Sequence, residues 1–136
     1  MAENALTKFL RDVRFGGMKA KASQQIQARG VAEAVIANGQ AASAALDLGE
    51  ATALAVQMPA AWTAAGLYVQ ASDDGVTFGP VSDKSGTPYA IAVAASEVVA
   101  LDREILRPFR HIKLVSGAAG ADVNQAAART LKVILG

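Results

Sequence analysis

Residues 66–78, GLYVQASDDGVTF, combine an alternating strand pattern with a strong turn signal. Leu67, Val69 and Ala71 occupy every second position, which places them on one face of an extended strand. The segment 73–75, Asp-Asp-Gly, is typical of a tight turn, because Asp side chains hydrogen-bond the nearby backbone and Gly adopts a positive φ without strain. This stretch therefore predicts a β-strand followed by a reversal of the chain.

The same pattern extends on both sides of this stretch, from Val31 to the end of the chain. Further strands are predicted at 31–37, 43–48, 52–58, 76–78, 89–94, 98–101, 110–115 and 129–135, with turns at 38–39 and 84–86 and a loop at 116–127. No long helical pattern lies between the strands, which disfavours a parallel α/β sheet. We therefore predict a mainly β fold, with residues 31–136 forming one antiparallel β-sandwich of jelly-roll-like type.

Composition sets limits on this domain. Hydrophobic residues make up 52% of the 136 residues, but many are alanine and aromatics are only 5%, so the core should be thin. There is no cysteine, which excludes disulfides and thiolate metal sites. No run approaches the roughly 18 apolar residues of a membrane span, and charged residues interrupt the N-terminal region, so no signal peptide or membrane partner is predicted.

Charge divides the chain into two parts. Residues 1–30 carry six cations and two anions, a net charge of +4, whereas residues 31–136 carry seven cations and ten anions, a net charge of −3. We therefore predict a basic N-terminal arm, residues 1–30, attached to an acidic sandwich domain, residues 31–136. The arm's cations are not interleaved with aromatic residues, which disfavours a stacking platform for nucleic acid.

The arm also contains a short amphipathic pattern. Leu6, Phe9, Leu10 and Val13 follow the i, i+3, i+4, i+7 spacing of one helical face. A helix of about ten residues is marginal alone and becomes ordered when its apolar face is buried. We therefore predict that the arm is an anchoring segment whose site residues are these four apolar residues together with Arg11 and Arg14.

Few residues suggest catalysis or metal binding. His111, the only histidine, falls in a charged strand pattern and is expected on the strand surface. Asp73 and Asp74 could offer oxygen ligands to calcium, but they lack the further spaced acids of an EF-hand loop, and an Asp-stabilised turn is the simpler interpretation. Asp102 and Glu104 could act as paired carboxylates, although nearby arginines favour a solvated ion-pair cluster. We predict no enzyme, with no catalytic, cofactor or metal site.

Aromatic residues leave a second class of function open. Trp62, Tyr68, Tyr89 and Phe109 could form a sugar-stacking platform, but in a small domain aromatic side chains more commonly anchor the core. We expect Trp62 in particular to be buried at the end of the sandwich, beneath residues 59–61.

Several segments spread over residues 32–136 resemble a family of small virion structural proteins of tailed bacteriophages. The most specific part is MPAAWTAA at 58–65, followed by the turn sequence QASDDGVTF at 70–78. The other matching positions are residues 36–40 (IANGQ), 46–49 (LDLG), 56–57, 69, Tyr89, 100–102, Arg110, Leu114, 116–117 and 129–131. The arm is not part of the resemblance. A second similarity, at 69–78 and 110–114, is to the discoidin-type galactose-binding sandwich and supports the jelly-roll-like fold.

The first resemblance implies a virion structural protein, assembled in the host cytoplasm. A capsid decoration (cement) or head-spike protein attached through its arm is the leading expectation. Its partners would be the major capsid protein or neighbouring virion subunits, and it would form a homo-oligomer, with a trimer favoured. The alternative is a carbohydrate- or receptor-binding module of a phage tail or spike.

Overall fold

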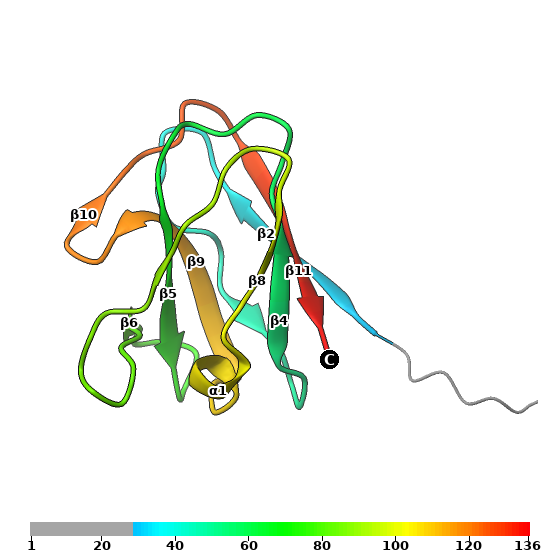
Figure 1. The fold of residues 1–136 in the computed structure, drawn as a ribbon, viewed down its shortest axis with the longest axis vertical. Helices are drawn as coiled ribbons and strands as arrows, with labels where there is room; N and C mark the ends of the chain where they lie inside the picture. Colours follow the sequence, from blue (N-terminus) through cyan, green and yellow to red (C-terminus); the bar gives the residue numbers. More distant parts are fainter. Residues whose placement is uncertain (1–28) are drawn as a thin grey trace, which may run out of the picture.

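The computed structural model describes residues 29–136, and within them two antiparallel sheets pack face to face (Figure 1). The predicted mainly β sandwich is therefore confirmed. The anchoring residues predicted in the arm, Leu6, Phe9, Leu10, Arg11, Val13 and Arg14, lie outside the described residues. No helix in the described part of the chain is long and apolar enough to cross a membrane.

One sheet has six strands, in the order β10-β9-β5-β6, with β3 added to β9 and β7 added to β5. These strands are β3 (Leu46–Asp47), β5 (Leu67–Ser72), β6 (Gly79–Pro80), β7 (Ala90–Ile91), β9 (His111–Ala118) and β10 (Ala121–Asp122). In its centre Val69 pairs with Leu114 and Ala71 pairs with Ile112. Part of the stretch 66–78 therefore forms a central strand, β5, whose apolar face points into the core as predicted.

The other sheet has four strands in the order β2-β11-β4-β8. They are β2 (Val31–Ile36), β4 (Ala53–Gln57), β8 (Val98–Ala100) and β11 (Arg129–Leu135). The last strand has the bounds predicted from the sequence. Its alternation buries Leu131 and Val133 completely, where they face the other sheet across the core.

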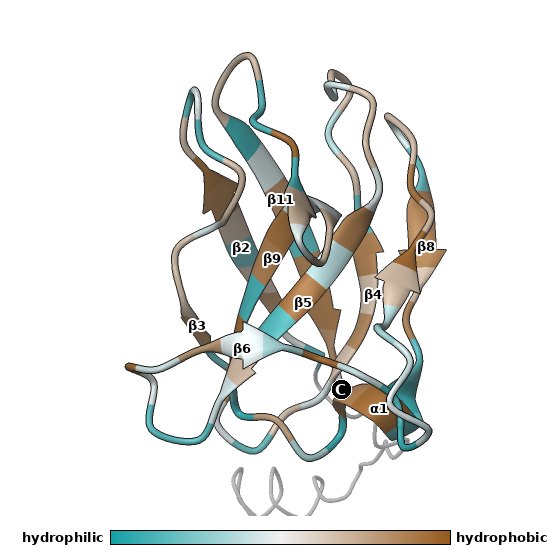
Figure 2. Ribbon diagram, turned by 90° about the vertical axis from the view of Figure 1, so that its left-hand side faces the viewer, coloured by the Kyte–Doolittle hydropathy of each residue, from teal (hydrophilic) through white to brown (hydrophobic). Residues whose placement is uncertain are grey.

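The core contains both large and small side chains. Leu67, Leu114 and Leu131 are among its large buried side chains, whereas Ala34 and Ala53 fill other fully buried positions. Apolar residues concentrate along the strands and polar residues in the connecting loops (Figure 2).

One helix was not predicted, α1 (Arg103–Leu106). Asp102 is its N-cap, accepting hydrogen bonds from the backbone N–H groups of Glu104 and Ile105, and Leu106 is only 1% exposed. Four residues are too few to show helical periodicity, so the cap and the burial of Leu106, rather than a pattern, fix this turn.

Several strand boundaries also differ from the prediction. The strands predicted at 43–48 and 89–94 shorten to β3 (Leu46–Asp47) and β7 (Ala90–Ile91). β9 continues to Ala118 and turns at Gly120, which has a φ of 83°, into β10, where a loop was expected. The alanine-rich sequence 117–121 did not predict this hairpin, because it has no apolar–polar alternation. The predicted strand at 76–78 does not form, because the chain remains in the turn until β6.

Candidate functional site

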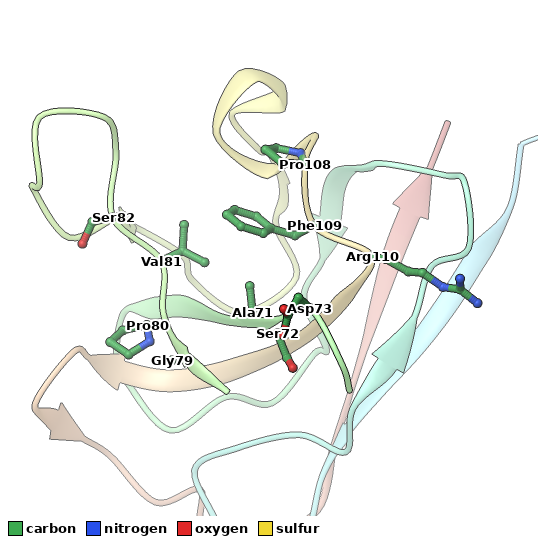
Figure 3. A pocket seen from close by; sticks show the side chains of 10 residues that line it. All are labelled: Ala71, Ser72, Asp73, Gly79, Pro80, Val81, Ser82, Pro108, Phe109 and Arg110. Carbon is green, nitrogen blue, oxygen red and sulfur yellow. The ribbon is translucent and has the colours of Figure 1, made fainter. Parts of the chain in front are cut away.

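A concave surface of the described residues lies at one end of the sandwich. A hollow of about 550 Å³ lies between the end of β5, β6 and residues 108–110 (Figure 3). A second hollow of about 530 Å³ lies between loop 82–85 and α1, and the two share Ser82, Pro108 and Phe109. We call these adjoining hollows the end groove.

The inner surface of the end groove is apolar. The ring of Phe109 points into it toward Val81, which is 5% exposed (Figure 3). Pro80, Pro108 and Ile105 add apolar surface on either side. The groove is therefore suited to hold an apolar side chain rather than a small charged ligand.

Carboxylates dominate the rim of the end groove. Asp73 borders the first hollow, and Asp83, Asp102 and Glu104 border the second. Lys84 is the cation of the second hollow. The Arg110 side chain points away from the first hollow (Figure 3), toward Asp47, so it does not neutralise this rim.

The acidity extends over the whole end of the domain. Its loops hold seven of the ten anions of residues 31–136 and four of the seven cations, a net charge of −3 that equals the charge of the entire domain. These residues are the anions Asp47, Glu50, Asp73, Asp74, Asp83, Asp102 and Glu104 and the cations Lys84, Arg103, Arg107 and Arg110.

The arm joins the domain at this same acidic end. β2 begins there, beside the end of β11 and not far from α1 (Figure 1). The backbone N–H of Leu135 donates to the carbonyl of Gly30 (2.9 Å), and that of Thr52 donates to the carbonyl of Gly136 (2.8 Å). The sequence of the +4 arm therefore joins the domain at the end that carries these acidic residues.

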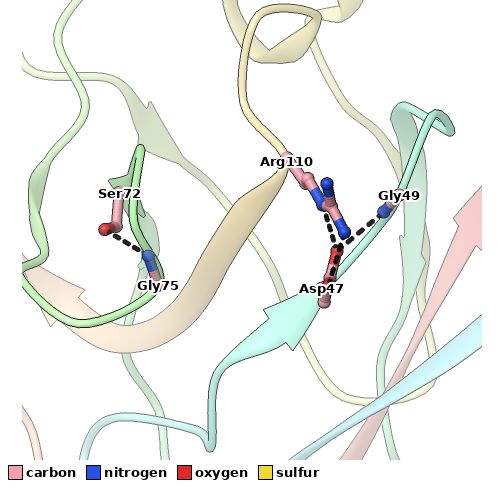
Figure 4. A network of polar contacts seen from close by, with 5 residues as sticks. All are labelled: Asp47, Gly49, Ser72, Gly75 and Arg110. Atoms are coloured by element: carbon pink, nitrogen blue, oxygen red, sulfur yellow. Dashed lines mark hydrogen bonds and ion pairs between the residues drawn. The ribbon is translucent and has the colours of Figure 1, made fainter.

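Two turns at this end are held by carboxylates of lowered pKa, of which Figure 4 shows Asp47. Asp47 accepts from Arg110 Nε at 2.7 Å and from the Gly49 N–H at 3.0 Å. The Arg110 guanidinium, followed by the Gly49 N–H, lowers the pKa of Asp47 to about 2. This exposed pair connects β3 to the start of β9.

Asp74 forms the other turn. Its Oδ1 accepts from the N–H groups of Val76 and Thr77 and from the Ser72 hydroxyl, and these bonds lower its pKa to about 2. Ser72 Oγ in turn accepts from the Gly75 N–H at 2.9 Å (Figure 4). The predicted Asp-stabilised turn is what the structure contains, and no group of three or more His, Asp or Glu side chains gathers as a metal site within residues 29–136.

The other candidate residues occupy separate places. His111 is a half-buried residue of β9 whose ring lies against Gly75. Asp102 and Glu104 do not form one ion-pair cluster, because Asp102 caps α1 while Glu104 pairs with Arg107 at 3.5 Å across exposed side chains. Both carboxylates nevertheless border the second hollow of the end groove.

The four aromatic residues do not form one platform. Trp62 lies in the loop between β4 and β5 at the opposite end, where its Nε1–H donates to the Ala65 carbonyl at 3.1 Å. Its side chain packs against the core but is only half-buried, which corrects the expectation that it is buried. Tyr89 accepts from the Asp102 N–H at 2.7 Å, and only Phe109 enters the end groove.

Tyr68 faces outward from the six-stranded sheet. It packs with Ala41 and Val115 in a small second cluster, and its hydroxyl donates to Asp122 at 2.6 Å. Burial, together with this hydrogen bond, raises the pKa of Tyr68 to about 12. This buried phenol connects β5 to β10 and has a structural role.

The sequence did not single out Pro80, Val81 or Pro108 as residues of a site. The GPVSD and RPF segments that carry them lie about 30 residues apart in the chain, and only the pairing of β5 with both β6 and β9 brings them together. No family model, curated protein or solved structure matches the chain.

Proposed function

We propose that the chain is a non-enzymatic structural subunit of a bacteriophage virion that assembles through its N-terminal arm. The observation that carries this proposal is the charge polarity of the molecule, with a +4 arm joined to the −3 end of a compact sandwich. Such a subunit offers neighbours both a basic segment and an acidic surface.

Within the virion, capsid decoration or a head spike is the role that the sequence resemblance favours. The resemblance covers the sandwich and leaves out the arm, which supports a division of labour between a displayed domain and an attachment segment. The partners would be the major capsid protein or neighbouring virion subunits.

Binding to particles tests this proposal. A chain lacking residues 1–28 should remain folded by circular dichroism but lose occupancy on phage heads prepared without the protein. A matched control, Ser23→Ala with Gln24→Ala, changes polar arm residues outside the apolar face and should bind at wild-type occupancy. Full occupancy of the truncated chain would show that the sandwich, not the arm, attaches.

A carbohydrate-binding module is the second candidate, because Phe109 lies in a groove bordered by carboxylates. Aromatic rings stack on sugar faces, and carboxylates accept hydrogen bonds from hydroxyl groups. Titration of the ¹H–¹⁵N spectrum with host-surface glycans would reveal it as shifts confined to residues 79–85 and 102–110. Particle occupancy that survives loss of the arm, together with such shifts, would favour this candidate.

A further inference from the structure

We propose that the apolar face of the arm of one copy docks in the end groove of a second copy of the chain. The proposal builds on the assembly role of the arm proposed above, and it names both the partner and the docking surface. Its two parts are the face formed by Leu6, Phe9, Leu10 and Val13 and the groove around Phe109.

Shape and apolarity match between these two parts. The end groove consists of two adjoining hollows, of about 550 and 530 Å³, that meet at Phe109. In the helix predicted from the sequence, the large side chains at i, i+3, i+4 and i+7 would lie on one face about one turn apart. Two of them can enter the two hollows together, in the manner of a helix seated in a groove.

Charge matches as well. Arg11 and Arg14 border the apolar face of the arm, while Asp73 and Glu104 border opposite hollows of the groove and are both exposed. The arm carries +4 and the loops around the groove −3, so docking brings opposite charges together. This complementarity speeds encounter and sets orientation, while burial of the apolar face supplies most of the affinity.

The course of the chain favours a second copy over the arm's own domain. The carbonyl of Gly30 is still in the ladder with β11, so the chain enters the domain along the line of β2. Residues 18–29 contain no Gly or Pro to reverse the chain. These twelve residues would span about 18 Å as helix or about 40 Å when extended, a length sufficient to reach a second copy.

Charge reversal tests the docking in the full chain. Sedimentation velocity of the wild type should show an oligomer. Reversing the arm (Arg11→Glu with Arg14→Glu) or the groove (Asp73→Lys with Glu104→Lys) should each weaken association by about tenfold or more. The matched control, Glu33→Lys with Glu97→Lys, makes the same charge change away from the groove and should leave the oligomer intact.

Mixing the two reversed chains identifies the source of the arm. The acidic arm of one variant fits the basic groove of the other, and the unaltered arm and groove also fit, so the mixture should regain the oligomer that neither variant forms alone. Phe9→Ala, which leaves the charge unchanged, should weaken the wild-type oligomer too. Circular dichroism of each variant verifies that the sandwich is folded.

Three outcomes would overturn the proposal: a monomeric wild type, an oligomer that groove reversal leaves intact, or a mixture that stays dissociated. The last result would indicate docking on the arm's own domain. Because these measurements use the isolated chain, their failure is distinct from failure of the virion role, which is measured by occupancy on phage heads.

Discussion

At the scale of single residues, Gln125 shows how a loop without apparent order is fixed. Its side chain is 1% exposed. Its Oε1 accepts from the Thr63 N–H at 2.8 Å and from Arg129 Nε at 3.1 Å, while Nε2 donates to the Thr63 carbonyl at 3.1 Å and to Ser116 Oγ at 2.7 Å. Both donors and both lone pairs of this amide are therefore used. They connect three segments: the loop that precedes β5, the strand β9, and the start of β11.

Replacing Gln125 with Ala should therefore destabilise the domain markedly. Each buried partner left without a hydrogen bond costs about 1–3 kcal/mol, and the Ser116 hydroxyl, 0% exposed, is the most affected. Urea unfolding should show a lower midpoint with an unchanged slope. Asn124→Ala, at an exposed neighbouring position, should stay within about 0.5 kcal/mol of the wild type.

Gly75 combines a backbone requirement with a close contact. Its φ is +78°, and a Cβ at this position would lie 3.2 Å from Nδ1 of His111. Gly86 has a similar φ of +84°, but a Cβ there would meet nothing within 4 Å. The two glycines therefore separate the cost of the left-handed backbone from the cost of crowding.

We expect Gly86→Ala to cost about 1–2 kcal/mol through the backbone alone. Gly75→Ala should cost more, by the displacement of the His111 ring. In a His111→Ala background the two glycine substitutions should cost the same. His111→Ala itself should change the free energy of unfolding by about 0.5 kcal/mol at most, and equal costs of both glycine substitutions in the wild type would contradict the crowding contact.

At the scale of elements, β10 is a two-residue strand that depends on one side-chain contact. It pairs with β9 across the Gly120 turn, and Asp122 accepts a hydrogen bond from the hydroxyl of Tyr68 in β5. The contact ties three strands on the outer face of the six-stranded sheet, where the Ala41, Tyr68 and Val115 cluster lies.

The raised pKa of Tyr68 predicts a loss of stability at high pH. The phenol ionises near its ordinary value of 10.0 in the unfolded chain but near 12 in the folded one. Its contribution is therefore complete below pH 10 and is lost as the pH rises toward 12. Near-ultraviolet absorbance should show that the phenol of Tyr68 is still protonated at pH 10. Asp122→Asn should lower the pH at which Tyr68 is half ionised. An unchanged midpoint of this titration would show that Asp122 does not raise the pKa of Tyr68.

At the scale of the whole molecule, the core of the described residues begins well after the arm. Its buried apolar residues run from Ala34 to Val133, and β2, the first described strand, pairs with β11 over Val31–Ile36. Truncation is tolerated where no buried or hydrogen-bonded backbone is removed.

Deleting residues 1–28 should therefore change the free energy of unfolding by no more than about 0.5 kcal/mol. Deleting residues 1–36 removes β2 with its buried Ala34 and Ile36 and should prevent folding. Thermal and urea unfolding followed by circular dichroism measure both, and a large loss in the shorter deletion would mean that the arm belongs to the domain.

The sequence by itself determined the layered β fold and the polarity of charge. Alternation in 67–71, 112–114 and 131–135 is local, so it specifies which face of each strand is buried whatever the partner strand. Only the tertiary structure decided that Phe109, Val81 and Glu104 share one groove, that Asp102 caps a helix and that Gln125 closes the opposite end. Those groups come together through strand pairing and loop contacts between residues distant in sequence. Such contacts produce no periodic pattern in the sequence from which they could be predicted.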